Sequence, residues 1–489
     1  MIDLANQLIQ DKSARIHFVG IGGLGLSALA DFRVLSGGTV SGSDRSFDNG
    51  LAVVQRDGFV SRGITIYPQD GSGIPGAAGL VISVAIETNL PSDILHSLWS
   101  DEGRRFLCSK PDLMDVLHAN APDVAAAVMR NVPIIRRTEW IAAYTHMYPT
   151  IAITGTAGKS TTTAMVFEIL RACGCNPSLI TGADLRILLE DGKPGSAYVG
   201  TGPLVIEADE SDRGIMTYAP ESTVILNLGH DHDSPERILE IYVALARSST
   251  KGIVISHDLA LASLTDQGVP VQKFSAQDIQ TYSDHVTFKY EGHLVKLQVP
   301  GAHNAQNGAA AMALGSLYGC NISDMINALS KFQGVARRFE VVGSSTAVDV
   351  VDDYAQNTLK IEAAIKTAQD RRRRVIVYMQ PVGFGPMRLM RTDLCPMIAK
   401  ILRPQDQFFM APIPYFGGTV VKDISSDLLV DDIRAAGPAG RVDLMENREA
   451  FILWAQQQTY QDDVILVMGA RDPTLPAFAR DIARAVIVN

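Results

Sequence analysis

The fold is decided by TIAITGTAGKSTTTAMVFEILRA, residues 150–172. Its first five residues are typical of a buried strand, and apolar residues recur at helical spacing after the turn GTAGKS. In such a turn, backbone N–H groups and the ammonium of Lys159 can surround phosphates, and the hydroxyl of Ser160 can ligate Mg²⁺. The order of strand, turn and helix predicts a triphosphate-binding loop.

The strict form of this motif has a further glycine where Ile153 stands, so this loop is a shorter version. We expect its residues to hold the phosphates of ATP. They are Gly155, Thr156, Gly158, Lys159, Ser160 and Thr161.

A second glycine-rich turn, GIGGLG at residues 20–25, follows the strand-like RIHFVG and precedes a helix-like stretch. Its glycines permit a diphosphate to approach the helix N-terminus. Asp44, at the end of the next strand, can receive hydrogen bonds from a ribose or base. By itself the motif is typical of an NAD-dependent dehydrogenase, or of a turn that serves only packing. A dehydrogenase leaves the triphosphate loop unexplained.

Acidic and imidazole groups follow two later strands, in EADESD at residues 207–212 and in GHDHD at residues 229–233. Carboxylate oxygens beside ATP phosphates are the ligands that Mg²⁺ requires. The pattern predicts one or two metal ions, and the alternative is a solvated acidic loop.

The chain has 489 residues, several times the usual size of one domain. Short β-branched runs alternate with longer amphipathic stretches along its length, which predicts an α/β fold with mainly parallel sheets. The pattern restarts near Pro149 and near Gln333. We therefore expect three domains, at residues 1–148, 149–332 and 333–489.

Composition excludes several classes of protein. Lys and Arg number 43 against 53 Asp and Glu, and the formal charge of -10 argues against a nucleic-acid partner. Five scattered cysteines predict a reducing compartment, and Cys173 and Cys175 lack the further ligands of a zinc site. No secretory leader or long apolar run is present, so we expect a cytoplasmic protein without membrane insertion. The sequence leaves the oligomeric state open.

Taken together, the motifs resemble those of the Mur ligase family across all three expected domains. The resemblance is greatest to the branch that joins L-alanine to UDP-N-acetylmuramate. It implies a Rossmann-like N-terminal domain, a central P-loop ATPase-like domain and a Rossmann-like C-terminal domain. It is carried by GIGGLGLSALA with SGSD, GTAGKSTTT, EADESD, the Asp231-His232 pair, PGAHNAQNGAAA, GVARRFE and VDDY.

The resemblance also implies roles for individual residues. The UDP end of a sugar nucleotide would contact Gly20, Gly22, Gly23, Gly25 and Asp44. Catalytic roles would fall to Lys159, Glu207, His232 and Arg338. Mg²⁺ would be held by Ser160, Glu207 and His232. Further contacts to ATP would come from His303, Asn304, Asn307, Arg338 and Asp353.

The implied activity is that of an ATP-dependent amide ligase in peptidoglycan precursor synthesis. The carboxylate of UDP-N-acetylmuramate would attack the γ-phosphate of ATP, and the amine of L-alanine would displace phosphate from the acyl phosphate. Two anions must approach each other, so Lys159 and Mg²⁺ would serve to stabilise negative charge.

The expected amine site departs from the family pattern. Alanine-adding members have Asp-Tyr-Gly-His-His-Pro, but Tyr354 is followed here by Ala355, Gln356, Asn357 and Thr358. A His-Arg pair after the next strand is replaced by Val382 and Gly383. We expect Arg388 and Arg391 to bind the amino acid's carboxylate instead, or to be surface residues. Another amino acid, a recycled peptide, or a nucleotide-binding pseudoenzyme remain alternatives.

Overall fold

The computed structural model describes residues 1–210, 213–229, 234–415, 421–470 and 472–487. The chain forms two compact units. The first comprises Met1–Phe274 and Ala310–Met325, and the second comprises Ser275–Ala309 and Ile326–Asn489. The three domain boundaries expected from the sequence therefore remain predictions.

The N-terminal sheet has five parallel strands in the order β3-β2-β1-β4-β5. Alternate residues point to opposite faces, so that Phe18 and Val81 enter one core while Val19 and Leu80 enter another. Burial on both faces explains the nearly continuous apolar strands. The strands are β1 (Ile16–Val19), β2 (Val40–Ser43), β3 (Thr65–Tyr67), β4 (Gly79–Ile82) and β5 (Ile134–Arg136).

Helices α1 (Ile2–Gln10), α2 (Leu24–Leu35), α3 (Arg45–Asp48), α4 (Val53–Ser61) and α10 (Arg137–Met147) belong to this part of the chain. The connection from β4 to β5 is unusually long for neighbouring parallel strands, for which about a dozen residues suffice. It contains α5 (Val84–Thr88), α6 (Ser92–Leu98), α7 (Asp101–Cys108), α8 (Pro111–Asn120) and α9 (Pro122–Met129). The sequence reasoning did not predict these helices.

The central sheet has the order β12-β11-β10-β6-β9-β7-β8 and is parallel except for the β7–β8 pair. Its strands are β6 (Thr150–Thr154), β7 (Ser178–Ile180), β8 (Ala197–Tyr198), β9 (Leu204–Glu207), β10 (Ser222–Ile225), β11 (Gly252–Ser256) and β12 (Val271–Phe274). Its helices are α11 (Lys159–Ala172), α12 (Arg186–Glu190), η1 (Arg213–Thr217), α13 (Pro235–Ser248) and η2 (Leu259–Asp266).

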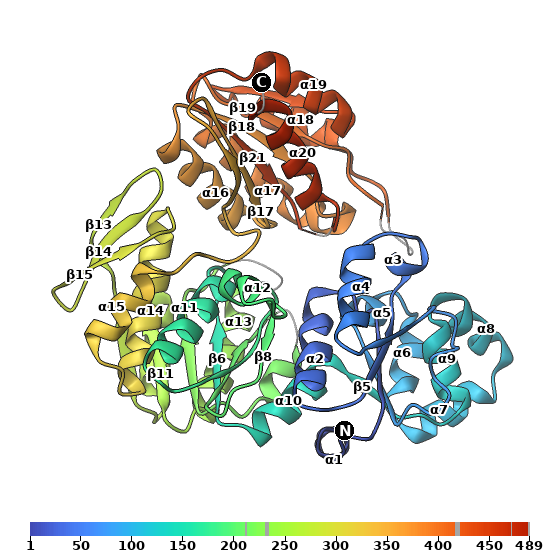
Figure 1. Cartoon of the computed structure of the whole chain (residues 1–489). Helices are drawn as coiled ribbons and strands as arrows, with labels where there is room; N and C mark the ends of the chain where they lie inside the picture. The colour runs from blue at the N-terminus through green and yellow to red at the C-terminus, as the bar shows by residue number, and fades with distance from the viewer. Residues whose placement is uncertain (211–212, 230–233, 416–420, 471, 488–489) are drawn as a thin grey trace. The chain divides into compact units, whose positions relative to one another are not determined.

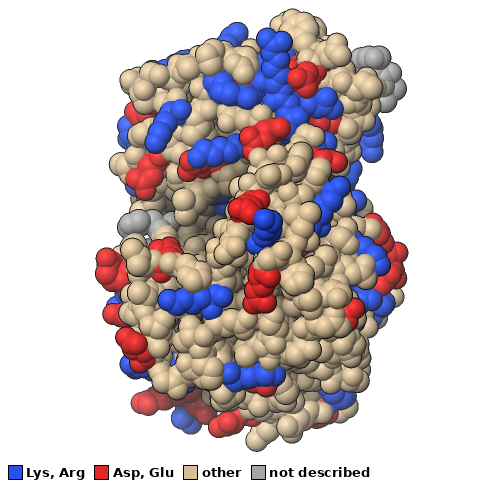
Figure 2. All heavy atoms as spheres, turned by 90° about the vertical axis from the view of Figure 1, so that its left-hand side faces the viewer, with Lys and Arg blue, Asp and Glu red and all other residues tan. Residues whose placement is uncertain are grey.

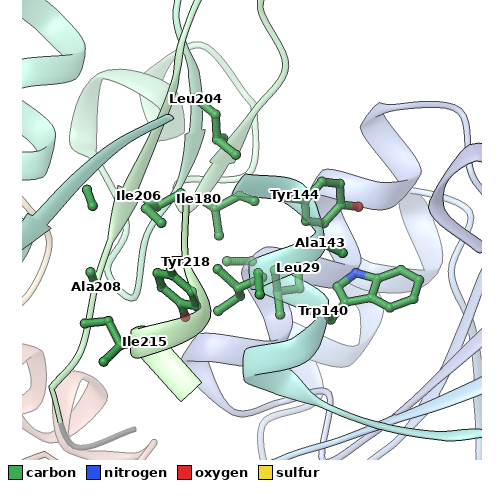
Figure 3. Close-up of a cluster of buried hydrophobic side chains, with 14 of the residues drawn as sticks. Leu29, Trp140, Ala143, Tyr144, Ile180, Leu204, Ile206, Ala208, Ile215 and Tyr218 are labelled. Carbon is green, nitrogen blue, oxygen red and sulfur yellow. The ribbon is translucent and has the colours of Figure 1, made fainter. Parts of the chain in front are cut away.

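One hydrophobic core joins the N-terminal and central sheets within the first unit. Figure 3 shows Trp140 and Tyr144 of α10 and Leu29 of α2 beside Ile180 and Ile206 of the central sheet. All five side chains are almost completely buried. The two sheets therefore share apolar contacts instead of being connected by chain alone.

The second unit begins with a small antiparallel sheet of β13 (Gln277–Thr281), β14 (Val286–Tyr290) and β15 (His293–Leu297). No strand is predicted in this region from the sequence. The division between the two units falls within α14 (Ala302–Leu317) and α15 (Ile322–Ser330).

The C-terminal sheet has the order β16-β17-β21-β18-β19-β20, and β16 alone among these strands is antiparallel to its neighbour. One face packs on α16, α17 and α18 and the other on α19 and α20 (Figure 1). The strands are β16 (Glu340–Ser344), β17 (Val348–Asp353), β18 (Arg374–Met379), β19 (Gln407–Met410), β20 (Arg441–Leu444) and β21 (Asp463–Met468). The helices are α16 (Thr358–Arg371), α17 (Phe384–Ile401), α18 (Ser426–Ala435), α19 (Arg448–Gln458) and α20 (Leu475–Ile487).

The sheets and flanking helices confirm the predicted α/β fold class. Basic and acidic side chains are interspersed on the face shown in Figure 2. Within the described part of the chain, no helix is both long and apolar enough to cross a membrane. All five cysteines are free thiols.

Candidate active site

The predicted triphosphate loop joins β6 to α11. Gly155 and Gly158 have φ angles of 139° and 90°, which glycine adopts far more readily than other residues. Helix α11 begins at Lys159, so the amide groups of its first turn lack intrahelical acceptors and can bind an anion. Ser160 is buried and Thr161 is half-buried in that turn. The local structure is the strand, turn and helix predicted from the sequence.

Lys159 is buried within this loop. Its Nζ donates hydrogen bonds to the Gly155 carbonyl at 2.9 Å and to Glu210 Oε2 at 2.7 Å, and it lies 3.8 Å from Asp209 Oδ1. Burial acts to lower the pKa of Lys159, but the two neighbouring acids outweigh it and raise that pKa above its usual value. Burial raises the pKa of Glu210, and Lys159 opposes this rise. Lys159 therefore binds one of the protein's own carboxylates, that of Glu210.

Glu207 lies at the carboxyl end of β9, beside β6. Its Oε1 accepts a hydrogen bond from Ser160 Oγ at 2.8 Å. Its Oε2 accepts hydrogen bonds from Thr181 Oγ at 2.9 Å and from the Gly182 amide at 3.0 Å. A hydroxyl and a carboxylate oxygen thus lie side by side at the start of α11, and both are hard ligands that suit Mg²⁺.

The middle of the loop contacts Asn227, which no predicted motif contains, and Gly229, the first residue of GHDHD. The side chain of Asn227 accepts a hydrogen bond from the Ala157 amide and donates one to the Ala157 carbonyl, both at 2.9 Å. The hydroxyl of Thr156 accepts a hydrogen bond from the Gly229 amide at 2.9 Å. Thr156 is therefore occupied in holding the loop. No short motif would have identified Asn227, because its role depends on a contact between distant segments.

The N-terminal glycine turn is closed by Asp44. Asp44 Oδ2 accepts a hydrogen bond from the Gly22 amide at 2.9 Å, and its Oδ1 accepts one from the Ser46 amide at 2.8 Å. A Cβ on Gly22 would lie 2.9 Å from Asp44 Oδ2. Asp44 therefore fixes the turn and caps α3, in addition to the ligand contact predicted for it.

The remaining glycines of this turn are required by close neighbours. Gly20 has a φ of 80°, and a Cβ there would lie 2.7 Å from Ser83 Oγ. The Gly23 amide donates a hydrogen bond to the Gly20 carbonyl at 3.1 Å. A Cβ on Gly25 would collide with the guanidinium of Arg137. Arg137 is thus a cation at the turn that the sequence reasoning missed.

In the second unit, the predicted adenine contacts lie on the first turns of α14. Asn304 and Asn307 are buried, whereas His303 is exposed. Asn304 Nδ2 donates to the Pro300 carbonyl at 2.7 Å, and Asn307 Nδ2 donates to Asn304 Oδ1 at 3.2 Å. These contacts order the start of the helix, and the contact with adenine remains a prediction.

Arg338 and Asp353 are brought together beside Tyr354. The Arg338 guanidinium lies 5.1 Å from the centre of the Tyr354 ring. Asp353, at the end of β17, accepts hydrogen bonds from the amides of Phe339 and Ala355, both at 2.7 Å. Burial raises the pKa of Asp353 to about 6, and Arg338 acts against that rise.

Both arginines predicted to bind the incoming amino acid already pair with acids. Arg388 forms an ion pair with Asp423 and donates a hydrogen bond to the Val421 carbonyl at 2.9 Å. Arg391 Nε lies 2.5 Å from Asp432 Oδ2. A substrate carboxylate would have to compete with these partners for the two guanidinium groups, and binding of the amino acid there stays a prediction.

The positions that lack the family's histidines and His-Arg pair have local structural functions. The side chain of Asn357 caps α16 by accepting a hydrogen bond from the Lys360 amide at 3.0 Å. Val382 is buried in the core, and Gly383 precedes α17 with a φ of 118°. None of these three residues supplies a charge to the carboxyl edge of the sheet.

His232 and Asp231, predicted near the second metal ion, lie outside the described residues. So does Arg471 of the MGARDP segment, for which the sequence suggested no role. Among residues that the structure describes, no group of three or more His, Cys, Asp and Glu side chains could hold a metal ion.

Three family models match the chain, and together they take in well over half of it. The Mur ligase family catalytic domain matches residues 15–93. The Mur ligase middle domain matches residues 153–315, and the Mur ligase glutamate ligase domain matches residues 337–471.

The chain is also similar to whole proteins. It is 27% identical to UDP-N-acetylmuramate--L-alanine ligase of Desulfosudis oleivorans, over 94% of this chain and 96% of that protein. The crystal structure of UDP-N-acetylmuramate-alanine ligase MurC from Thermotoga maritima has a TM-score of 0.73 at 22% identity, covering 97% and 99% of the two chains. The murein peptide ligase from Psychrobacter arcticus has a TM-score of 0.63 at 19% identity, covering 97% and 98%. The two structures support the fold.

Proposed function

Since the chain belongs to the Mur ligase family, and is thus an ATP-dependent ligase that forms a C–N bond, we propose that it joins the carboxylate of UDP-N-acetylmuramate to L-alanine. The proposal places this reaction in peptidoglycan precursor synthesis. The N-terminal turn would hold the sugar nucleotide, the central loop would hold ATP, and the C-terminal domain would hold the amino acid.

The observation that carries the proposal is the arrangement of Lys159, Ser160 and Glu207 around the start of α11. One buried ammonium, one hydroxyl and one carboxylate lie at a helix N-terminus whose amides can bind anions. This combination suits a Mg²⁺-bound triphosphate better than it suits a neutral ligand or a dinucleotide.

The residues present fit Mg²⁺, because Ser160 Oγ and Glu207 Oε1 are hard oxygen donors 2.8 Å apart. Bound there, Mg²⁺ would neutralise charge as the substrate carboxylate approaches the γ-phosphate. His232 is proposed as a further ligand.

The protein's own groups would act chiefly by position and charge. Lys159 would leave Glu210 and bind phosphate oxygens, which stabilises the charge that develops on the transferred phosphoryl group. The substrate carboxylate would form a C–O–P bond with the γ-phosphorus while the bond to ADP breaks. The amine would then displace phosphate from the acyl phosphate and lose a proton. No enzyme nucleophile is required.

A recycled peptide in place of L-alanine is a second candidate. It is favoured by the engaged state of Arg388 and Arg391, and by the similarity in fold to a murein peptide ligase over nearly the whole chain. The exposed Leu389 lies between these arginines on α17 and offers an apolar contact that a free amino acid does not need.

The test is an amine screen that measures phosphate release and product mass. UDP-N-acetylmuramate, ATP and Mg²⁺ would be combined with L-alanine, D-alanine, glycine, L-serine or the tripeptide L-alanyl-γ-D-glutamyl-meso-diaminopimelate. We expect release with L-alanine, and D-alanine is the matched stereochemical control. Release only with the tripeptide would replace L-alanine as the substrate. ATP binding without release for every amine would identify a pseudoenzyme.

A further inference from the structure

A short segment after β10, residues 226–229, lies directly against the triphosphate loop. Strands β10 and β6 are parallel neighbours with Ile225 opposite Thr154. The Leu226 amide donates a hydrogen bond to the Thr154 carbonyl at 3.0 Å. A Cβ on Gly155 would lie 2.8 Å from Leu226 Cβ, so the loop and the segment are in contact where the loop begins. We call residues 226–229 the clamp segment.

The clamp segment binds the middle of the loop through hydrogen bonds on both sides. Asn227 satisfies the amide and the carbonyl of Ala157, each at 2.9 Å. The Thr156 hydroxyl receives a hydrogen bond from the Gly229 amide at 2.9 Å and donates to the Gly229 carbonyl at 3.3 Å. Thr156 and Ala157, the two central residues of the loop, are therefore both held by the clamp segment.

We propose that Asn227 is the positioning residue that sets the triphosphate loop in its binding conformation before ATP arrives. This inference rests on the proposed ATP site. Gly155 and Gly158 flank the two held residues, and glycine loses more conformational freedom on ordering than other residues do. Without Asn227, ATP binding would have to order the loop and would be weaker for that reason.

Asn227 also determines which amides remain available to phosphates. The Ala157 amide donates its hydrogen bond to Asn227 Oδ1, so it is not available to a phosphate oxygen. The amides of the first turn of α11, beginning at Lys159, are left for phosphate oxygens. The clamp thus selects the donors as well as ordering the loop.

Asn227 is itself fixed from α13. The hydroxyl of Tyr242, a fully buried side chain, donates a hydrogen bond to the Asn227 carbonyl at 3.2 Å. Removing this hydroxyl takes away the hydrogen bond to the Asn227 carbonyl and leaves the two side-chain hydrogen bonds from Asn227 to Ala157. Tyr242→Phe is therefore a weaker version of the same change.

The test compares steady-state constants for both substrates. In Asn227→Ala, we expect the KM for ATP to rise about 10- to 100-fold, because two hydrogen bonds to the loop are lost, while the KM for the sugar nucleotide is unchanged. Tyr242→Phe should raise the KM for ATP only about 2- to 5-fold. The control is Thr223→Val on β10, which removes a buried hydroxyl pair with Ser249 at 2.8 Å and should lower the melting temperature without altering either KM.

Amide hydrogen exchange of the ligand-free protein supplies a second readout. Residues 155–158 should exchange faster in Asn227→Ala than in the unaltered protein or in Thr223→Val. Unchanged exchange there, or equal changes in both KM values, would overturn the inference. If the unaltered protein binds no ATP, the proposed function fails, and the exchange comparison still decides whether Asn227 orders the loop.

Discussion

The two glycine-rich turns of the first unit have the same strand-turn-helix structure, but side chains of different charge hold them in place. Both join a parallel strand to a helix, one between β1 and α2 and the other between β6 and α11. In the N-terminal turn, the carboxylate of Asp44 accepts a hydrogen bond from the Gly22 amide. In the central turn, the neutral amide of Asn227 holds Ala157, and the ammonium of Lys159 lies over the Gly155 carbonyl.

This difference gives two turns of similar backbone shape different charges, which accords with the different ligands proposed for them. A carboxylate at the turn disfavours phosphate oxygens that approach the same amide, and it favours groups that donate hydrogen bonds. A neutral amide and an ammonium leave the second turn attractive to several negative charges. The group that closes the turn, more than the glycines, sets the chemistry of the site.

Among the substitutions at the two turns, Lys159→Ala should have the largest effect. Turnover should fall by at least about 100-fold, because the main positive charge at the central turn is lost. The change also leaves Glu210 buried without its cation, so the melting temperature should fall. Phosphate release and thermal unfolding measure the two effects.

The double variant Lys159→Ala/Glu210→Gln separates them. It should regain thermal stability and remain inactive, since the unpaired carboxylate is gone but the ammonium is still missing. A Lys159→Ala protein that folds and turns over at a near-normal rate would remove Lys159 from the proposed mechanism.

The helices that follow the two turns each carry a buried acid, so the effect of pH on protein stability can be compared between them. On α11, burial raises the pKa of Glu168 to about 8, helped by Glu190 and opposed by Arg171. The native state therefore binds this proton more tightly than the unfolded state, so stability falls as pH rises from 4.5 to about 8. Glu168→Gln should remove this loss, which is on the order of 4 kcal/mol near pH 8. Thermal unfolding across this pH range measures it.

On α2, the matched carboxyl is Asp31, whose pKa burial raises only to about 6. Its Oδ1 lies 2.7 Å from Arg62 Nε, which favours the charged form. The stability that protonated Asp31 contributes should be lost as the pH rises from 3.8 to about 6, a lower pH range than that of Glu168. If the melting temperature of both the unaltered protein and Glu168→Gln did not change with pH, the raised pKa values of Glu168 and Asp31 would be contradicted.

Asp44→Asn is the mildest test. An asparagine can accept only through its one carbonyl oxygen, so either the Gly22 or the Ser46 hydrogen bond is lost. The KM for the sugar nucleotide should rise about tenfold, which corresponds to about 1.4 kcal/mol, and the KM for ATP should not change. Asp48→Asn, an exposed acid nearby with the same change of charge, serves as the control. A rise in both KM values would show that the two turns are not independent.

The strands that could be predicted were those buried on both faces. Strands such as β1, β6 and β18 are recognisable from the sequence because most of their positions are apolar, His17 and Arg374 being exceptions. Strand β13 could not be predicted, since most of its residues are exposed and polar, and β15 has only two buried positions, Val295 and Leu297. The long β4–β5 connection was missed because short helices have weak periodicity.

Site residues divide in the same way. Lys159, Ser160 and Glu207 were predicted because a motif or a strand end marks them, and the structure brings them together. Asn227 could not be predicted, since it meets its partner Ala157 across 70 residues of chain. Arg388 and Arg391 were chosen by residue type, and only the structure reveals Asp423 and Asp432 as their partners.

The apolar core around Trp140 and Tyr144 has a practical consequence for anyone who divides the molecule. Cutting the chain after residue 148 would strip Ile180, Leu204 and Ile206 of the side chains that cover them. The fragment that begins at residue 149 would expose these apolar side chains to solvent and would tend to aggregate. The two glycine-rich turns are therefore best studied together, in a protein that keeps this shared core intact.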